Sequence, residues 1–256
     1  GFGADLGFEK FMHIKARFHD LEPHAAVLVA SAKALKSHGG VSTRALDTPD
    51  TEAIRKGMPN LEHMVGLVRS FGLPVVVALN RFGTDTAEEL AAAKQIALDS
   101  GVNAAVEADG FARGGEGMTA LAEAVIQAAT APDGVKYAYP LDASAEEKVE
   151  ALARSIYNAE DVSWTAEARR QLRQFESLGW GKLPICMAKT HLSISHDPSL
   201  KGRPSGYTFR IMDIRASVGA GFLYTLAGRI ETLPGLPTRP RAMDMDVTPD
   251  GEIVGL

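Results

Sequence analysis

The chain contains little of what disulfide-rich, membrane or nucleic-acid-binding proteins need. Its 256 residues include one cysteine, Cys186, so no internal disulfide can form. The 27 Lys and Arg residues are outnumbered by 32 Asp and Glu residues, and a chain of net charge -5 lacks the basic surplus that sequence-independent nucleic-acid binding requires. No apolar run approaches the roughly 20 residues that span a bilayer, and residues 1–10 do not resemble a signal peptide. We therefore expect a globular cytoplasmic protein with neither a nucleic-acid nor a membrane partner.

A phosphate-binding loop is also missing from the sequence. The Walker A pattern GxxxxGK[ST] does not occur. The opening string GFGADLG comes close to the dinucleotide pattern GxGxxG, but its third glycine is one place late and no strand precedes it. A plain turn before a helix and a weak dinucleotide loop are both compatible with this string. The chain begins at Gly1 rather than at Met, which is typical of a fragment or a processed chain.

Two further kinds of catalytic site lack essential residues. His191 and His196 are five positions apart, and no third ligand stands at a spacing that is typical of zinc. Cys186 lies within an apolar run, where a packed side chain is more common than a nucleophile. Arg215 stands two positions before Ser217, where the nucleophile elbow of a hydrolase needs glycine. We expect no metal site and no serine hydrolase.

What the chain does contain is an alternation of apolar strands and amphipathic helices. Three apolar runs are expected to form strands that are buried in a parallel sheet, at residues 25–31, 73–79 and 102–106. Helices are expected over residues 8–17, 60–71, 87–99, 145–158 and 166–178, with capping boxes at Thr86/Glu89 and Ser144/Glu147. Weaker strand signals cover residues 183–187, 207–215 and 221–227. This order predicts an α/β fold of mainly parallel sheets flanked by helices, with an irregular Pro/Gly-rich C-terminal tail.

A boundary between two domains is expected within the polar stretch of residues 41–58, which contains Pro49. Pro59 and Asn60 follow this stretch, and Asn60 is suited to cap a new helix. The sequence therefore indicates a division into residues 1–58 and residues 59–256.

Aromatic residues follow two of the expected strands. Phe82 comes after the strand at 73–79, and Phe111 comes after the strand at 102–106. Ligands of open parallel sheets bind beyond the carboxyl ends of the strands, and two rings at neighbouring strand ends can clamp a flat heterocycle. The alternative is that both phenylalanines belong to the core. A glycine-rich motif follows Phe111, formed by Gly114, Gly115, Glu116 and Gly117.

A polar cluster follows the expected strand at 183–187. Lys189 offers a compact positive charge and Thr190 a hydroxyl, which both suit a phosphate or a carboxylate, and Asp197 follows closely. A polar loop after a strand accounts for the same residues without any ligand, and the spacing favours this simpler interpretation.

Several strings, taken together and in order, resemble the formate–tetrahydrofolate ligase family. They are GFGADLGFEK (1–10), LPVVVALNRF (73–82) with TDT (84–86), GGEG (114–117), LPICMAKT (183–190) with residues 193–198, SVGAGF (217–222), LPGLP (233–237) and DGEIVGL (250–256). Each string is weak by itself, whereas the ordered set covers the whole chain and is specific.

The resemblance implies an α/β enzyme that is related to P-loop NTPases. Members use MgATP to phosphorylate formate, and they transfer the formyl group from formyl phosphate to N10 of tetrahydrofolate. A monovalent cation assists, and bacterial members are usually homotetramers. Formate is a poor acyl donor because its leaving group would be oxide, and phosphorylation supplies a better one.

The resemblance also implies roles for particular residues. In the family two aromatic residues sandwich the pterin, and the matching positions are Phe82 and Phe111, the second of which is commonly Trp in relatives. Phe2 and Pro204 match positions of the adenine pocket. A family string also contains three residues without an assigned chemical step: Lys189, Thr190 and Asp197.

The family's remaining functional groups are expected upstream of Gly1. They include the Walker A loop, the formyl-phosphate ligands and the carboxylates of the cation site, so the catalytic residues are expected there too. Residues 1–58 would complete a nucleotide-binding domain, and residues 59–256 would form the folate-binding domain. The chain alone should then be inactive and should need the missing N-terminal portion of the enzyme. A catalytically inert folate-binding or assembly fragment is the alternative, and a dinucleotide enzyme fits the loop spacing less well.

Overall fold

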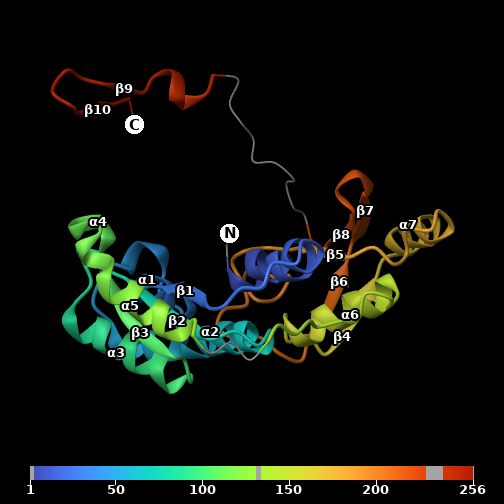
Figure 1. The fold of residues 1–256 in the computed structure, drawn as a ribbon, viewed down its shortest axis with the longest axis horizontal. Helices are drawn as coiled ribbons and strands as arrows, with labels where there is room; N and C mark the ends of the chain where they lie inside the picture. The colour runs from blue at the N-terminus through green and yellow to red at the C-terminus, as the bar shows by residue number, and fades with distance from the viewer. Residues whose placement is uncertain (1–2, 131–133, 229–238, 256) are drawn as a thin grey trace.

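The computed structural model describes residues 3–130, 134–228 and 239–255, and this part of the chain has an α/β architecture (Figure 1). The strands are β1 (Ala26–Ala30), β2 (Val75–Asn80), β3 (Ala104–Ala108), β4 (Asp161–Trp164), β5 (Ile185–Ala188), β6 (Thr208–Ile211), β7 (Asp213–Ser217), β8 (Phe222–Leu226), β9 (Asp246–Val247) and β10 (Ile253–Val254). The α-helices of the described ranges are α1 (Ala32–His38), α2 (Thr51–Ser70), α3 (Ala87–Asp99), α4 (Gly110–Arg113), α5 (Thr119–Ala128), α6 (Ala145–Ser155) and α7 (Ala166–Ser177). The expected combination of parallel sheets and flanking helices is confirmed.

The first sheet has the order β1-β2-β3, and all its strands are parallel. Val75, Val77 and Leu79 face the helices α1, α2 and α3, whereas Val76 and Ala78 face α5. This two-sided cover explains why β2 reads as a continuous apolar run. The strand begins two residues later than expected because Pro74 has no N–H to donate to a ladder.

Helix α2 crosses the expected boundary between residues 58 and 59. It begins at Thr51, and the side chain of Asp50 caps it by accepting a hydrogen bond from the N–H of Ala53 at 2.8 Å. Pro59 lies inside the helix, and Asn60 is no cap. Burial of one apolar face outweighs the hydrogen bond that an interior proline removes.

The two sides of that boundary also share one sheet. Strand β1 precedes residue 58 and pairs in register with β2, which follows it. The structure therefore does not separate the chain at residues 58 and 59. The sequence reads as polar here because Glu52, Arg55 and Lys56 lie on the exposed face of the first turns of α2, although Ala53 and Ile54 on the other face are buried.

Strand β1 also differs from its expectation, which was a buried strand. Val27 and Val29 are 43% and 67% exposed. Their neighbours on β2 are Val76 and Ala78, which α5 covers. Ala26, Leu28 and Ala30 on one face of the strand are partly buried against the core, whereas α5 does not extend over Val27 and Val29 on the other face.

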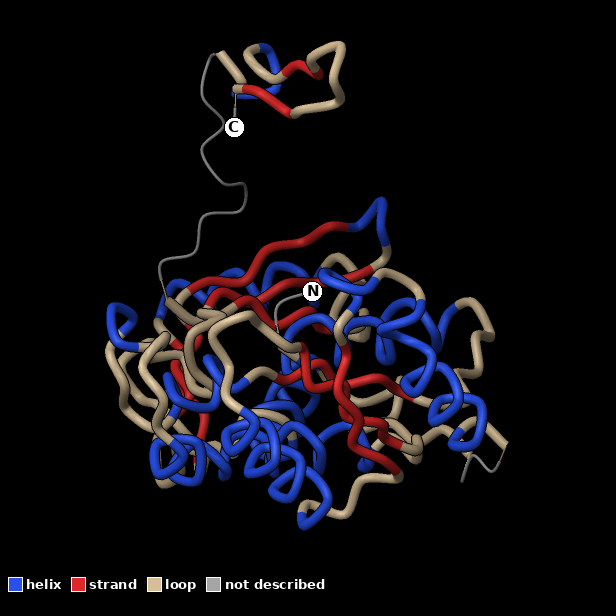
Figure 2. The backbone as a smooth tube through the Cα atoms, turned by 90° about the vertical axis from the view of Figure 1, so that its left-hand side faces the viewer, coloured by secondary structure: helices blue, strands red, loops and turns tan. Residues whose placement is uncertain are grey.

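The second half of the chain holds a mixed sheet, β5-β8-β7, and a parallel pair, β4-β6. Residues 207–215 were expected to form one strand, but they divide at Met212 into β6 and β7, which belong to different sheets. Strand β4 was not expected, because four residues are too short a signal. In Figure 2 the strands of the main body run between helices, and β7 and β8 project from it in Figure 1.

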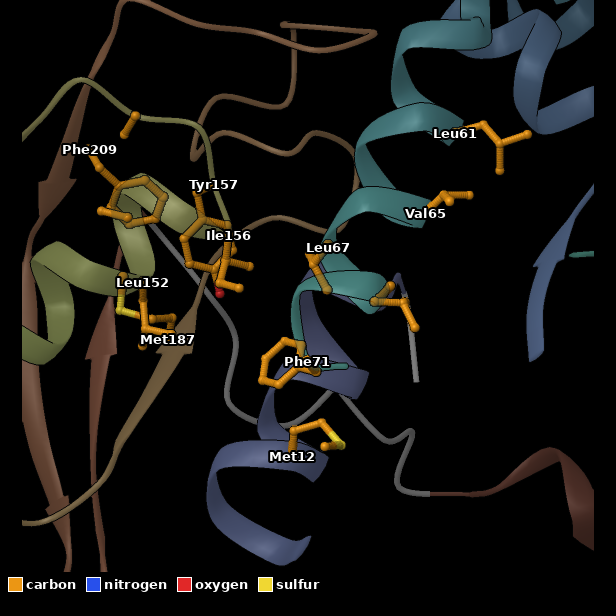
Figure 3. Packing of buried hydrophobic residues seen from close by; sticks show 14 of the residues in the cluster. Met12, Leu61, Val65, Leu67, Phe71, Leu152, Ile156, Tyr157, Met187 and Phe209 are labelled. Atoms are coloured by element: carbon orange, nitrogen blue, oxygen red, sulfur yellow. The ribbon is translucent and has the colours of Figure 1, made fainter. Parts of the chain in front are cut away.

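One core joins the two halves. Met12, Phe71, Tyr157 and Phe209 are almost fully buried in the same cluster, and Figure 3 shows them between the helices and strands of both halves. The expected first helix is π-helical over Ala4–Phe8 and Phe11–Ala16. The expected irregular tail lies partly outside the described residues, and its described part contains the antiparallel pair of β9 and β10.

Candidate functional site

A hollow of about 580 Å³ lies at the carboxyl ends of β2 and β3. Parallel strands end at the same edge of a sheet, and the N–H of Arg81 bonds the carbonyl of Ala108 at 3.1 Å, which joins the two strand ends. The loops that follow both strands line the hollow with Asn80, Arg81, Phe82, Gly83, Asp109, Phe111 and Ala112.

The two phenylalanines singled out in the sequence thus line one hollow. Phe82 is 40% exposed and Phe111 is fully exposed, so the alternative that both belong to the core is wrong. Arg81, at the rim, lies 3.7 Å from the Glu107 carboxylate. The hollow combines open aromatic surface with a carboxylate and an amide, which are groups that can hold a flat, polar heterocycle.

Phe82 is held by residues that no sequence pattern indicates. Its backbone N–H bonds Asp85 Oδ2 at 2.8 Å, and Lys33 Nζ lies 4.9 Å from the centre of its ring. Lys33 also contacts Asp47 at 2.5 Å, and Asp47 accepts a hydrogen bond from Thr84 Oγ1 at 3.1 Å. The bonds from Lys33 and Thr84 lower the pKa of Asp47. No sequence signal links Lys33 to Phe82, because they are far apart in the chain and meet only across the sheet edge.

A buried ion pair links the helices that adjoin the loop after Phe82. Lys36 Nζ lies 2.7 Å from Glu89 Oε1, and both side chains are excluded from solvent. Glu89 also accepts hydrogen bonds from the N–H groups of Asp50 and Thr86, at 3.0 and 3.1 Å. Burial raises the pKa of Glu89, but these bonds outweigh it and leave the pKa lowered. One carboxylate therefore ties α1 to the starts of α2 and α3, and the expected capping box at Thr86 is confirmed.

The glycine-rich motif shapes the loop that carries Phe111. Gly114 has a positive φ of 56° and ends the short helix α4. Gly117 packs against the backbone of Asp109, where a Cβ atom would lie 2.3 Å from the carbonyl oxygen. Glu116 pairs with Arg113 at 2.8 Å on the surface. The motif therefore holds α4, and with it Phe111, by backbone geometry, whereas Gly115 has open space around it.

A second hollow, of about 230 Å³, lies beside β1 and is lined in part by Gly3, Asp5, His38 and Asn60. Lys189 is paired with Asp5, which lines the hollow, and does not offer its charge to a ligand. Its Nζ lies 2.6 Å from Asp5 Oδ2 and donates to the carbonyls of Thr190 and Ser193 at 2.9 and 2.6 Å. Three acceptors satisfy the three protons of an ammonium. Burial lowers the pKa of Lys189, against the influence of Asp5.

Thr190 and Asp197 have local partners. Thr190 Oγ1 accepts a hydrogen bond from the N–H of Leu192 at 3.2 Å. Asp197 accepts bonds from both the N–H and the hydroxyl of Ser199, at 2.8 and 2.7 Å, and these lower its pKa. These contacts fit the interpretation of a structured polar loop.

Pro204 lies in a loop that three side chains hold. His38 Nδ1 accepts a hydrogen bond from the N–H of Gly202 at 3.3 Å, and Asn60 Nδ2 donates to the Gly202 carbonyl at 3.1 Å. Asn158 Nδ2 donates to the carbonyl of Pro204 at 2.8 Å. Because His38 and Asn60 also line the second hollow, the Pro204 loop borders it. Phe2, the other expected adenine contact, lies outside the described residues.

The described ranges also bear on membrane insertion and on metal binding. No helix there is long and apolar enough to cross a bilayer. No group of three or more His, Cys, Asp and Glu side chains in those ranges is placed to hold a metal ion. Burial raises the pKa of the Cys186 thiol, which keeps it protonated.

Known proteins resemble the chain along its whole length. The profile of the family described as formate–tetrahydrofolate ligase matches residues 1–256. A formate–tetrahydrofolate ligase of Roseiflexus castenholzii is 50% identical over 264 residues, which cover 100% of this chain and 47% of that protein. The cytoplasmic C-1-tetrahydrofolate synthase of Rattus norvegicus is 47% identical over 262 residues, which cover 99% of this chain and 28% of that protein. The chain thus spans about half the length of the ligases that it matches, and it aligns with their C-terminal half. With a family profile matched from the first residue to the last, the chain belongs to the formate–tetrahydrofolate ligase family.

Proposed function

We propose that this chain is the folate-binding part of an ATP-dependent ligase that forms 10-formyltetrahydrofolate from formate and tetrahydrofolate. The observation that carries the proposal is the hollow at the ends of β2 and β3, which is lined by Phe82 and Phe111. The names of the relatives, formate–tetrahydrofolate ligase and C-1-tetrahydrofolate synthase, support the same reaction and substrate.

The chemistry of the hollow suits a pterin. Its volume of about 580 Å³ falls in the range of small-molecule sites, roughly 300–1,000 Å³. A pterin offers two flat faces for stacking on Phe82 and Phe111, and its N–H groups are donors for a carboxylate such as that of Asp109. Lys33 lies against the ring of Phe82, which orients that ring before a ligand arrives.

The proposed reaction has two steps. An oxygen of formate attacks the γ-phosphorus of ATP, which gives formyl phosphate and ADP. N10 of tetrahydrofolate then attacks the formyl carbon, phosphate leaves, and N10 loses its proton. The contribution of this chain is to hold the pterin so that N10 meets a short-lived acyl phosphate at close range and away from water.

The second hollow is the proposed adenine pocket. Asp5 is bonded to Lys189, and the remaining polar lining consists of an amide, a hydroxyl and two imidazoles beside apolar side chains, from Asn60, Ser193, His38 and His191. Such a lining suits a purine base better than phosphates. Pro204 and Phe2 would flank the base, and the groups for MgATP phosphates, formyl phosphate and the monovalent cation would come from the portion that precedes the match in the relatives. Residues 1–58 would contribute to the nucleotide site without forming a separate domain, and a cytoplasmic homotetramer is a further part of this proposal.

A reconstitution experiment tests the proposal against the alternative of an inert folate-binding or assembly fragment. The 256-residue chain would be assayed for formate-dependent ATP cleavage and for 10-formyltetrahydrofolate, alone and after co-expression with the N-terminal half of the Roseiflexus castenholzii ligase. We expect no turnover by the chain alone and MgATP-dependent turnover by the pair. Turnover by the chain alone would refute the proposed division of roles. A stable pair that binds tetrahydrofolate without turnover would favour the inert fragment.

A further inference from the structure

One face of β1 and its outer edge form an apolar surface that the described residues leave uncovered. Within the described ranges β1 pairs with β2 alone, so the backbone groups on its other side have no ladder partner. Val27 and Val29 point to the same face as Val76 and Ala78, because partners in a parallel ladder share a face. Val76 and Ala78 are buried under α5, whereas Val27 and Val29 are 43% and 67% exposed.

Side chains of the strand also line a hollow. A hollow of about 250 Å³ runs between β1 and the first helical turn, lined by Gly3, Phe8, Val27, Val29 and Val68 among others. It shares Gly3, Ala4, Leu28 and Val29 with the hollow of about 230 Å³ described above. The strand therefore has open space along it as well as an exposed face.

This arrangement is unfavourable for a strand that remains at an edge. Edge strands of soluble proteins are usually short, charged, bulged or covered, since an open ladder recruits other chains. Strand β1, AVLVA, has no charged residue, no proline and no bulge in its pairing with β2. Parallel sheets are normally covered by helices on both faces. An apolar parallel strand with one bare face is thus suited to the interior of a larger sheet.

We propose that β1 is the docking surface for the polypeptide that corresponds to the N-terminal half of the longer relatives. That polypeptide would add a strand parallel to β1 and lay a helix over Val27 and Val29, beside α5. The relatives support this occupant, because the chain aligns with their C-terminal half and covers 47% of their length. The choice of partner rests on the proposed function, whereas the surface is argued from exposure and pairing alone.

Co-purification tests the proposal without any ligand or turnover, so its outcome is separate from that of the ligase assay. The tagged 256-residue chain would be co-expressed with the N-terminal half of the Roseiflexus castenholzii ligase. We expect the two to purify together, and Val29→Lys to reduce the recovered partner by about tenfold or more, as for a central interface residue. Leu178→Lys is the matched control, because Leu178 is 52% exposed at the end of α7, far from β1 in Figure 1.

Hydrogen exchange provides a second readout that needs no variant. In the complex the amides of Val27 and Val29, which alternate with those that face β2, should exchange at least about tenfold more slowly than in the chain alone, because a new ladder protects them. The proposal is overturned if no complex forms, if Val29→Lys and Leu178→Lys behave alike, or if exchange at β1 does not change. It is also overturned if the chain alone forms a dimer that Val29→Lys abolishes, since the occupant would then be a second copy.

Discussion

Replacing Phe82 by alanine should separate ligand binding from stability. The side chain is 40% exposed and its ring contacts Lys33, so its removal leaves no core cavity. Losing one cation–π contact at a surface costs about 0.5–1 kcal/mol of folding free energy. A bound pterin, by contrast, would lose one of its two stacking faces.

The expected loss of binding follows from the stacking free energy. Removing one face costs about 1–2 kcal/mol, which corresponds to a roughly 5–30-fold increase in the dissociation constant. We therefore expect Phe82→Ala to raise the KM for tetrahydrofolate by that factor in the reconstituted pair, while the KM for ATP changes by less than about twofold. Titration of tetrahydrofolate into the 256-residue chain by calorimetry gives the affinity directly.

A matched control makes the result interpretable. Phe18 is 48% exposed and lies outside the hollow, so Phe18→Ala removes a similar ring without touching the proposed site. The pterin assignment would be refuted if both variants had the same folate kinetics. A fall in the affinities for folate and ATP together, with a large loss of thermal stability, would show that Phe82 is a packing residue instead.

Three further predictions concern the supports of the hollow. Lys33→Met should raise the KM for tetrahydrofolate by about 2–5-fold, in line with the loss of one cation–π contact, with almost unchanged thermal unfolding. Glu89→Gln leaves the buried Lys36 without a charged partner and should lower the free energy of unfolding by about 3–5 kcal/mol in urea titrations. Because the pKa of Glu89 is lower in the folded chain than its ordinary value of 4.5, its ionised carboxylate stabilises the fold above pH 4.5, and this stabilisation is lost as the pH falls through the folded-state pKa. Acidification below pH 4.5 should therefore lower the free energy of unfolding more in the wild type than in Glu89→Gln. Gly117→Ala should displace α4 and weaken folate binding, whereas Gly115→Ala, which has open space, should not; equal effects would contradict the close-packing argument.

The sequence predicts those features of this molecule that depend on local chemistry. The capping boxes at Thr86 and Ser144 are where the sequence placed them, because each needs only residues three positions apart. Phe82 and Phe111 share a hollow because parallel strands must end at a common edge. For β2, burial on both faces follows directly from its unbroken apolar run.

Features that depend on distant partners were not predictable in this way. The start of α2 was placed too late because packing against α1 and the sheet, rather than local polarity, decides where that helix begins. Lys33 is indistinguishable from any surface lysine until the fold brings it to Phe82. The exposure of Val29 has the same origin, since an apolar strand sequence does not reveal which of its neighbours are provided by the chain itself.

The use of charge around the two hollows supports a division of labour within the proposed enzyme. Lys33 pairs with Asp47, Lys36 with Glu89, and Lys189 with Asp5. Each ammonium therefore orders a loop of this chain, and a phosphate could recruit it only by leaving a carboxylate behind, which is costly for the two buried pairs. Besides Arg81, which lies 3.7 Å from Glu107, the first hollow presents aromatic, amide and carboxylate groups, which recognise flat heterocycles through stacking and hydrogen bonds. Cations for an acyl phosphate must then reach the site from outside these three pairs, which is the contribution that we assign to the polypeptide docked on β1.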